Sequence, residues 1–361
     1  MSWKDLNHPQ AGGAEVVTVN LLKRLASDGH EVVLLTSRYP KSSEKDHLNG
    51  YQVIRNGGRY GVYFKSYQYY KKYLQGWADL VIDECNTLPF MTKFYVKEPT
   101  LMVFYMLCRE IWFYQLPKYI GWIGYILEPV YLRMLSSQKV LTISESSRQD
   151  LIKHGFEKDN IEIISVGIGI TPVQNYRNIT KYDKPTLLSL GSVRPMKQTL
   201  DQVKAFEIAK QSFPDLRLMI AGDYSGTYGE SVQQYVSNSE FSNDISMLGR
   251  ISEEQKIELT QKSHISLVTS VKEGWGLIVT EANSQGTPSV VYDVDGLRDS
   301  VKHGVTGLVT KTTPAALAES TIVLLNNHEL YDKIREAAHA WSKQITFEQS
   351  YEDFKKGAHI E

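Results

Sequence analysis

The chain has 361 residues, of which 42% are hydrophobic and 22% are charged, and its formal net charge is −1. This length exceeds the size at which one hydrophobic core usually keeps growing, so we expect two domains. The composition is that of an ordinary globular protein. The near-zero charge argues against a dedicated nucleic-acid binder, which would carry a clustered basic excess.

Cysteine usage and the first residues favour a cytoplasmic protein. Cys85 and Cys108 are the only cysteines, which is too few for a disulfide framework and indicates a reducing compartment. Residues 1–10 contain no apolar signal region.

The first half of the chain alternates strands with helices. Residues 14–27 are expected to form a helix introduced by Gly12 and Gly13, with further helices at 64–74 and 147–154. Buried or half-buried strands are expected at 31–36, 52–55, 79–83, 100–105, 139–143 and 161–166.

Residues 119–132 form the longest apolar stretch, interrupted by Glu128 and Pro129. A membrane-spanning helix needs roughly 20 residues, so this stretch does not predict one. We expect a helix buried in the core, and the alternative is a helix at a membrane interface.

The helix expected at 64–74 is rich in tyrosine and lysine. These side chains suit a lipid headgroup surface, although the tyrosines could equally pack on the sheet. The residues concerned are Tyr63, Tyr67, Tyr69, Tyr70, Tyr73, Lys65, Lys71 and Lys72.

After a polar stretch without periodicity, the strand–helix alternation restarts. Strands are expected at 186–190, 216–221, 245–248, 264–269 and 289–292, and helices at 199–211, 252–262, 314–326 and 329–342. Repeated βα units in both halves predict two doubly wound α/β domains, with ligands at the carboxyl ends of the strands and in the cleft between the domains.

This pattern divides the chain into four parts. They are an N-terminal domain (1–168), a linker (169–184), a C-terminal domain (185–342) and a terminal segment (343–361).

The segment 269–291 carries the strongest functional signal. Glu273 and Glu281 stand eight residues apart, with a short glycine loop and then a helix start between them. Such a loop presents backbone N–H groups at a helix N-terminus, which suits an anion such as a nucleotide diphosphate. Glu281, in the first turns of the helix, can accept hydrogen bonds from ribose hydroxyls. Alternatively, Gly274 and Gly276 only form a tight turn and Glu273 is solvated.

This motif, E-G-W-G-L with a second glutamate eight positions after the first, resembles the signature of the retaining family-4 glycosyltransferases (glycosyl transferases group 1). The resemblance runs from Gly12 to the terminal segment, and it implies that residues 343–361 form a helix that crosses back to the N-terminal domain. It implies the GT-B fold, in which two Rossmann-like doubly wound domains face each other across a cleft. It further implies a nucleotide-sugar donor held mainly by the C-terminal domain, an acceptor held by the N-terminal domain, and neither a metal nor a cofactor.

A basic glycine loop at 191–197 follows the first strand of the second domain. Arg194 and Lys197 can donate charge-assisted hydrogen bonds to a diphosphate, or the loop is simply solvated. The family carries G-R-x-x-x-x-K here. This chain keeps Gly191 and Lys197, but its arginine stands two positions later than usual.

Gly12 and Gly13 resemble the glycine-rich loop with which the family's N-terminal domain faces the donor phosphates, although a glycine pair before a helix is often a mere turn. In the family this loop follows the first strand of the sheet. Here only Met1 to Trp3 stand where that strand should end. We therefore expect either a sheet that lacks one central strand or a truncated chain.

Residues 104–114 also resemble the family, which commonly has a histidine near the transferred sugar at the position of Tyr105. Tyrosine can form hydrogen bonds there but does not titrate near neutral pH. The expected acceptor-side residues are Glu84, Asn86, Arg109 and Glu110, although Arg109 and Glu110 could instead form a structural ion pair.

The resemblance assigns a role to each candidate. The expected catalytic residues are Glu273, Lys197, Arg194 and Tyr105. The expected donor-binding residues are Gly12, Gly13, Gly191, Gly274, Trp275, Gly276, Leu277 and Glu281. No histidine or cysteine spacing predicts a metal site.

The predicted function is transfer of a hexose from a UDP-, GDP- or ADP-sugar to a sugar, lipid-linked or other hydroxyl acceptor, with cell envelope polysaccharide as the product class. The alternatives are a degenerate GT-B protein that serves as a non-catalytic partner-binding subunit and a nucleotide-sugar epimerase of the same fold. We expect a cytoplasmic enzyme, with peripheral contact at the inner face of the membrane as a further expectation.

Overall fold

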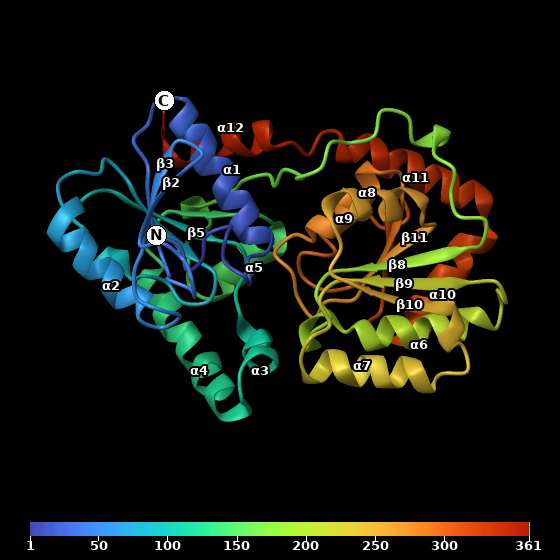
Figure 1. Ribbon diagram of the computed structural model, residues 1–361. Helices are drawn as coiled ribbons and strands as arrows, with labels where there is room; N and C mark the ends of the chain where they lie inside the picture. Colours follow the sequence, from blue (N-terminus) through green and yellow to red (C-terminus); the bar gives the residue numbers. More distant parts are fainter. Residues whose placement is uncertain (361) are drawn as a thin grey trace. The chain divides into compact units, whose positions relative to one another are not determined.

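The computed structural model describes residues 1–360, which form two compact units (Figure 1). Unit 1 comprises Met1–Gly167 and Thr346–Glu361, and unit 2 comprises Ile168–Ile345. The segment 169–184, predicted as a linker, belongs to unit 2. Its backbone is bound there, for example by the hydrogen bond of 3.0 Å from the Val173 amide to the Ser284 carbonyl. Residue 361, the last of the predicted terminal segment, lies outside the described residues.

Unit 2 is built on a six-stranded parallel sheet. Its strand order is β10-β9-β8-β11-β12-β13, which is the doubly wound order in which the first strand is central and the order reverses beside it. The strands are β8 (Thr186–Leu190), β9 (Arg217–Ala221), β10 (Ile245–Gly249), β11 (Ile265–Val268), β12 (Ser289–Tyr292) and β13 (Gly307–Thr310).

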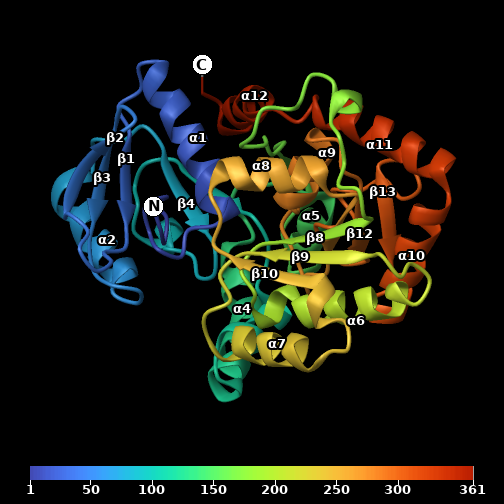
Figure 2. The same ribbon diagram turned by 45° about the vertical axis from the view of Figure 1, so that its right-hand side comes forward.

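Helices cover both faces of this sheet, with α6 and α7 on one side and α8 and α9 on the other (Figures 1 and 2). The strands β8, β11 and β12 are almost fully buried, as parallel strands covered on both faces must be, whereas the edge strand β10 exposes Ser246 and Leu248. The helices are α6 (Thr199–Lys210), α7 (Thr227–Asn238), α8 (Glu253–Lys262), α9 (Leu277–Ser284), α10 (Pro314–Asn326) and α11 (His328–Ser342).

Unit 1 contains two sheets. One has the order β4-β5-β6-β7 and is parallel, and the other has the order β1-β3-β2. The strands are β1 (Val33–Thr36), β2 (Lys45–Leu48), β3 (Tyr51–Arg55), β4 (Val81–Cys85), β5 (Thr100–Phe104), β6 (Val140–Thr142) and β7 (Ile161–Ile163).

Residues 1–3 lie between these two sheets. The Ser2 amide donates to the Leu35 carbonyl of β1 at 3.0 Å, and the Glu84 amide of β4 donates to the Met1 carbonyl at 3.0 Å. Among the described residues no strand is assigned before β1, as expected. Nevertheless, residues 1–3 form backbone hydrogen bonds to β1 on one side and to β4 on the other. They therefore occupy the position expected for the missing central strand.

The helices of unit 1 flank these sheets. The predicted helix 64–74 consists of α2 (Val62–Tyr69) and a π-helical continuation, η1 (Tyr70–Leu74). The remaining helices are α1 (Gly13–Ser27), α3 (Trp112–Gln115), α4 (Lys118–Leu135), α5 (Glu145–Lys153) and α12 (Phe347–Ala358), and the short segments include η2 (Thr92–Phe94) and η3 (Arg109–Ile111).

The expectation that residues 119–132 form a buried core helix is wrong. They lie in α4, whose outward side chains are more than one-third exposed and mostly apolar, including Ile126 at 61%. Within the described residues, no helix combines the length and apolar character needed to cross a bilayer.

The terminal helix α12 packs on unit 1 through a close backbone approach. The Ser165 amide donates to Asp353 at 3.0 Å, and the Gly167 amide donates to the Ser350 hydroxyl at 2.7 Å. A Cβ atom at Gly167 would lie 2.4 Å from the backbone nitrogen of Phe347. Only glycine therefore fits at position 167, where the backbone lies against the first residue of α12.

We expect Gly167→Ala to displace α12 and to destabilise unit 1 by about 1–3 kcal/mol, because the added methyl group must overpack against backbone. Denaturant unfolding followed by circular dichroism measures this. Gly58→Ala, where a Cβ atom would meet nothing within 4 Å, is the matched control. Equal stability of the two variants would contradict the prediction.

Candidate functional site

The strand order of unit 2 reverses between β8 and β11, and two loops meet at the carboxyl ends of these strands. The Val271 amide donates to the Met196 carbonyl at 2.8 Å, and the Thr269 hydroxyl donates to the Lys197 carbonyl at 2.8 Å. Ligands of open α/β sheets bind at such a switch point. These bonds fix the basic loop 191–197 against the loop that carries Glu273.

Lys197 and Glu273 form an ion pair at this point. The Lys197 ammonium and the Ser270 hydroxyl both donate to Glu273 Oε1, the second at 2.6 Å. Burial on its own would raise the pKa of Glu273, but the charge of Lys197 and the hydrogen bonds from Lys197 and Ser270 lower it below its ordinary value. The nearby charge of Arg194 acts in the same direction. Glu273 is therefore a carboxylate at neutral pH.

Helix α9 begins at Leu277, four residues after Glu273. Gly276, its N-cap, has a φ of 92°, and no side chain caps this end of the helix. Gly296 packs so closely that a Cβ atom there would lie 2.2 Å from the Glu273 carbonyl oxygen. Beside these glycines, Trp275 Nε1 is buried without a hydrogen-bond partner in the structure. The uncapped helix N-terminus favours an anionic ligand. The Trp275 ring itself lies 6.1 Å from the ring of Trp341 on α11.

Glu281 lies on α9, one turn after its first residue. Burial raises the pKa of Glu281, and the charge and hydrogen bond of Lys256 oppose that shift. The Lys256 ammonium is 3.4 Å from Glu281 Oε2 and 2.8 Å from Glu253. Sequence reasoning missed Lys256, because it lies in α8, outside the glycine motifs.

Gly191 and Arg194 belong to the basic loop that adjoins the glutamate loop. Gly191 follows β8 with a φ of 119°, and a Cβ atom at Gly222 would lie 2.0 Å from its carbonyl oxygen. Arg194 is exposed. Its guanidinium is therefore free to contact a ligand that binds beside this loop.

The unit 1 candidates form a second, buried polar cluster. The Thr18 hydroxyl is 2.9 Å from Glu84 Oε2 and 2.8 Å from the Tyr105 hydroxyl, and Tyr105 is only 6% exposed. The side-chain amide of Asn86 donates to the Glu84 carboxylate at 3.3 Å and to the Glu15 carboxylate at 3.4 Å. Burial, and then the charge of Glu84, raise the pKa of Tyr105 well above its ordinary value.

Glu84 is the most strongly perturbed carboxyl of this cluster. Burial raises the pKa of Glu84 to about 7; the hydrogen bond from Thr18 opposes this shift, and the charge of Glu15 adds to it. Glu15 also accepts a hydrogen bond of 2.6 Å from the Gly12 amide, at the start of α1. The glycine loop, Glu84, Asn86 and Tyr105 are therefore linked through Glu15 and Thr18, neither of which was predicted.

Arg109 and Glu110 lie apart from that cluster, on η3. Arg109 does not pair with Glu110. Its guanidinium is 3.6 Å from Glu128 of α4 and stacks 4.1 Å from the centre of the Tyr125 ring, while Glu110 is exposed. The structural role of Arg109 is thus to hold α4.

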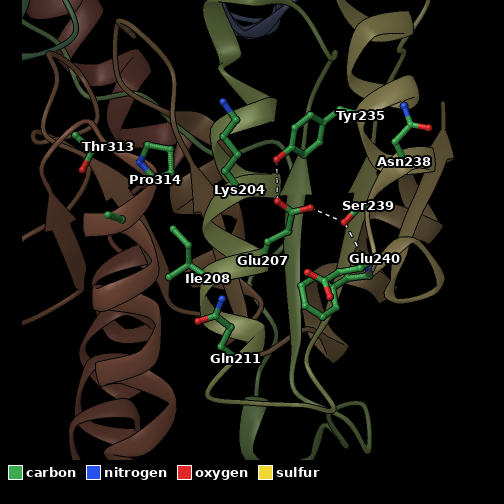
Figure 3. A pocket seen from close by; sticks show the side chains of 12 residues that line it. Lys204, Glu207, Ile208, Gln211, Tyr235, Asn238, Ser239, Glu240, Thr313 and Pro314 are labelled. Carbon is green, nitrogen blue, oxygen red and sulfur yellow. Dashed lines mark hydrogen bonds between the residues drawn. The ribbon is translucent and has the colours of Figure 1, made fainter.

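Neither cluster lines the hollow of about 910 Å³ shown in Figure 3, between α6, α7 and the start of α10. Its most prominent carboxylate, Glu207, is already bound by the hydroxyls of Tyr235 and Ser239. Across residues 1–360, no group of three or more His, Cys, Asp or Glu side chains could hold a metal ion.

Two family models match the chain. Glycosyltransferase Family 4 covers residues 11–171, and Glycosyl transferases group 1 covers residues 174–341. A curated relative, N-acetyl-alpha-D-glucosaminyl L-malate synthase of Bacillus anthracis, is 25% identical over 96% of this chain and 91% of its own length.

Solved structures show the same fold. Sucrose-phosphate synthase from Thermosynechococcus elongatus has a TM-score of 0.77 at 18% identity, covering 98% of this chain and 94% of its own. An Anabaena protein in complex with UDP-glucose has a TM-score of 0.70 at 18% identity, covering 97% and 96%. The predicted GT-B fold is confirmed.

The raised pKa of Glu84 predicts a dependence of stability on pH. The folded-state pKa of about 7 lies above the ordinary value of 4.5, so folding binds a proton between these values. The stability contributed by Glu84 is therefore fully present below pH 4.5 and is lost as the pH rises through about 7, a change of about 3 kcal/mol.

Glu84→Gln should remove this decline, so the variant should gain stability relative to the parent between pH 5 and pH 8, a range chosen from the two pKa values. Denaturant midpoints across this range measure the effect. Glu319→Gln, an exposed change on α10, should leave the parent's profile unaltered. Parallel profiles for Glu84→Gln and the parent would show that Glu84 keeps an ordinary pKa.

Proposed function

Because this chain belongs to the family-4 glycosyltransferases of the GT-B fold, we propose that it transfers a hexose from a nucleotide sugar to an acceptor hydroxyl. One observation carries the proposal. The Lys197–Glu273 pair lies at the switch point of unit 2, beside the uncapped N-terminus of α9. Cations and an open helix N-terminus suit the diphosphate of a nucleotide sugar, and carboxylates suit its ribose and sugar hydroxyls.

In this proposal Lys197, Arg194 and the N-terminus of α9 bind the diphosphate. Lys197 is paired with Glu273 in the free protein, so a bound diphosphate shares or takes over its ammonium. Positive charge held at this place stabilises the negative charge that develops on the leaving nucleotide diphosphate. The proposal therefore includes chemistry without a metal or another cofactor.

Glu281 accepts hydrogen bonds from the ribose, and Glu273 together with the backbone of Gly274–Leu277 holds the sugar. Glu281 is suited to its role because it is largely buried and has one cationic neighbour, Lys256. Retention of the anomeric configuration is part of the proposal and rests on the family. UDP-glucose in the Anabaena structure makes UDP-sugars the first donors to test, ahead of GDP- and ADP-sugars.

Unit 1 supplies the acceptor side in this proposal, through the cluster of Glu84, Asn86 and Tyr105 at the start of α1. Its glycines Gly12 and Gly13 are proposed to approach the donor phosphates. The acceptor is a sugar, a lipid-linked saccharide or another hydroxyl compound, and a cell envelope polysaccharide is the proposed product class.

The site of action in the proposal is the cytoplasm, with peripheral contact at the inner face of a membrane. Both cysteines are free, in keeping with a reducing compartment. The α2–η1 segment, first considered for this contact, exposes Phe64 and Tyr73 but buries Tyr70. Tyr70 therefore packs inside unit 1, while the exposed Tyr73 is available for the proposed contact.

Incubation of the purified protein with UDP-, GDP- and ADP-sugars tests the proposed function. Slow donor hydrolysis, with thermal stabilisation by the same nucleotide, is the expected result. Stabilisation without hydrolysis or transfer to any acceptor would favour a non-catalytic subunit. Epimerised donor as the product would favour an epimerase of the same fold.

We expect Glu281→Ala to weaken donor binding by about 1.5–3 kcal/mol, because it removes a charged acceptor for the ribose hydroxyls. Titration calorimetry with the stabilising nucleotide measures this. Glu253→Ala is the matched control: Glu253 also contacts Lys256, yet its side chain is 71% exposed. Equal affinity of the two variants would remove Glu281 from the site.

Tyr105→Phe should lower turnover roughly 3- to 10-fold, because it removes one hydroxyl from the bonded cluster, while leaving nucleoside-diphosphate affinity nearly intact. Tyr105→His should keep or improve transfer, because it restores the residue type common in the family. Rates and melting temperatures of both variants are the measurements. A loss of stability with an unchanged rate would make Tyr105 a core residue only.

A further inference from the structure

Helix α4 presents an apolar face to solvent, and the inference drawn from it rests on the membrane contact included in the proposed function and not on the transfer reaction. We define the α4 surface as the outward residues of this helix, which recur at helical spacing and are each at least half exposed: Tyr119, Trp122, Ile123, Ile126, Leu127, Val130 and Met134. From Tyr119 to Met134 this surface is about 22 Å long. Contiguous exposed apolar patches of this kind mark interaction sites.

The inner face of α4 is fixed to the protein, so the outer face is not exposed through loose packing. Glu128 accepts hydrogen bonds from the Cys108 amide at 2.8 Å and from the Trp112 indole at 3.0 Å. A Cβ atom at Gly124 would lie 2.5 Å from the Trp112 ring. The helix is therefore held rigidly with one face outward, and in Figures 1 and 2 it extends away from the sheets of unit 1.

The exposed charges of residues 112–139, which include α4, are all positive. Between Trp112 and Lys139 the only acidic residue is Glu128, which faces inward and is 1% exposed. Lys118 and Arg133, at the two ends of the helix, are exposed. The nearest exposed acid before this stretch is Glu110, on η3.

Segment η2 extends this surface. The Lys93 ammonium donates to the Met134 carbonyl at 2.6 Å, which places η2 against the end of α4. The next residue, Phe94, is 54% exposed. An exposed aromatic side chain and a further cation therefore adjoin the α4 surface.

We propose that the α4 surface docks on an anionic phospholipid bilayer, with its apolar side chains in the interface and its flanking cations at the headgroups. Aliphatic side chains enter the boundary between headgroups and acyl chains, while tryptophan and tyrosine prefer the interface itself. Lysine and arginine without neighbouring acids are attracted to anionic lipids. A soluble protein partner would not require cations at both ends of an otherwise apolar face, and a second copy would bring like charges together.

Vesicle flotation with the full chain tests this. The parent should float with vesicles that contain phosphatidylglycerol and much less with phosphatidylcholine alone. In the Ile126→Glu/Val130→Glu variant the vesicle-bound fraction should fall about tenfold, because two charges enter the apolar face. Val323→Glu, a change of the same kind at a half-exposed position of α10, is the control and should float like the parent.

A second measurement guards against a folding defect in the double variant. Brominated lipids should quench the fluorescence of the parent, and Trp122→Phe should abolish most of that quenching. The proposal would be overturned if the parent did not float at low salt, or if the double variant floated as well as the parent. It would also be overturned if the parent were a dimer and the double variant a monomer, because the α4 surface would then join two copies of the chain. Donor binding does not enter any of these readouts, so they stand apart from the test of the transferase reaction.

Discussion

The reversal of strand order between β8 and β11 is the constraint on which the candidate donor site depends. Neighbouring strands at this point send their connections to opposite faces of the sheet, so no helix covers the space beyond their carboxyl ends. The basic loop and the glutamate loop meet there and are tied by one backbone hydrogen bond and by the Thr269 hydroxyl. An ion pair between Lys197 and Glu273 is possible because these loops hold both residues in place.

Charge is arranged differently in the two clusters. In unit 2 each site carboxylate has a cationic neighbour, Lys197 for Glu273 and Lys256 for Glu281. In unit 1 Glu84 is buried beside Glu15 and bonded mainly to neutral groups, so its pKa is raised. The unit 2 cluster is suited to binding and stabilising an anion, whereas the unit 1 cluster is suited to hydrogen bonding and to holding a proton near neutral pH.

The ion pair of Arg109 and Glu128 joins η3, which follows strand β5 of unit 1, to helix α4 and its exposed surface. The resemblance to the family drew attention to Arg109, but in the structure its guanidinium supports α4 through Glu128 and Tyr125. A buried carboxylate that also binds two backbone amides fixes the orientation of this helix. The apolar outer face of α4 thus follows from polar contacts on its inner face.

The sequence by itself determined the alternation of strands and helices, the two α/β halves and the glycine–glutamate motif, because these depend on local periodicity and on neighbours a few residues apart. The roles of Lys256 and Thr18 came only from the tertiary structure, because their partners Glu281 and Glu84 lie in other elements. Ser270 and Glu15 bond to residues three positions away, but those bonds depend on the conformation of the loops, which the sequence pattern did not give. The tertiary structure also placed residues 169–184 on unit 2 and turned the apolar side of residues 119–132 outward. Hydropathy records that a stretch is apolar, but the side that faces solvent is decided by contacts with residues elsewhere in the fold.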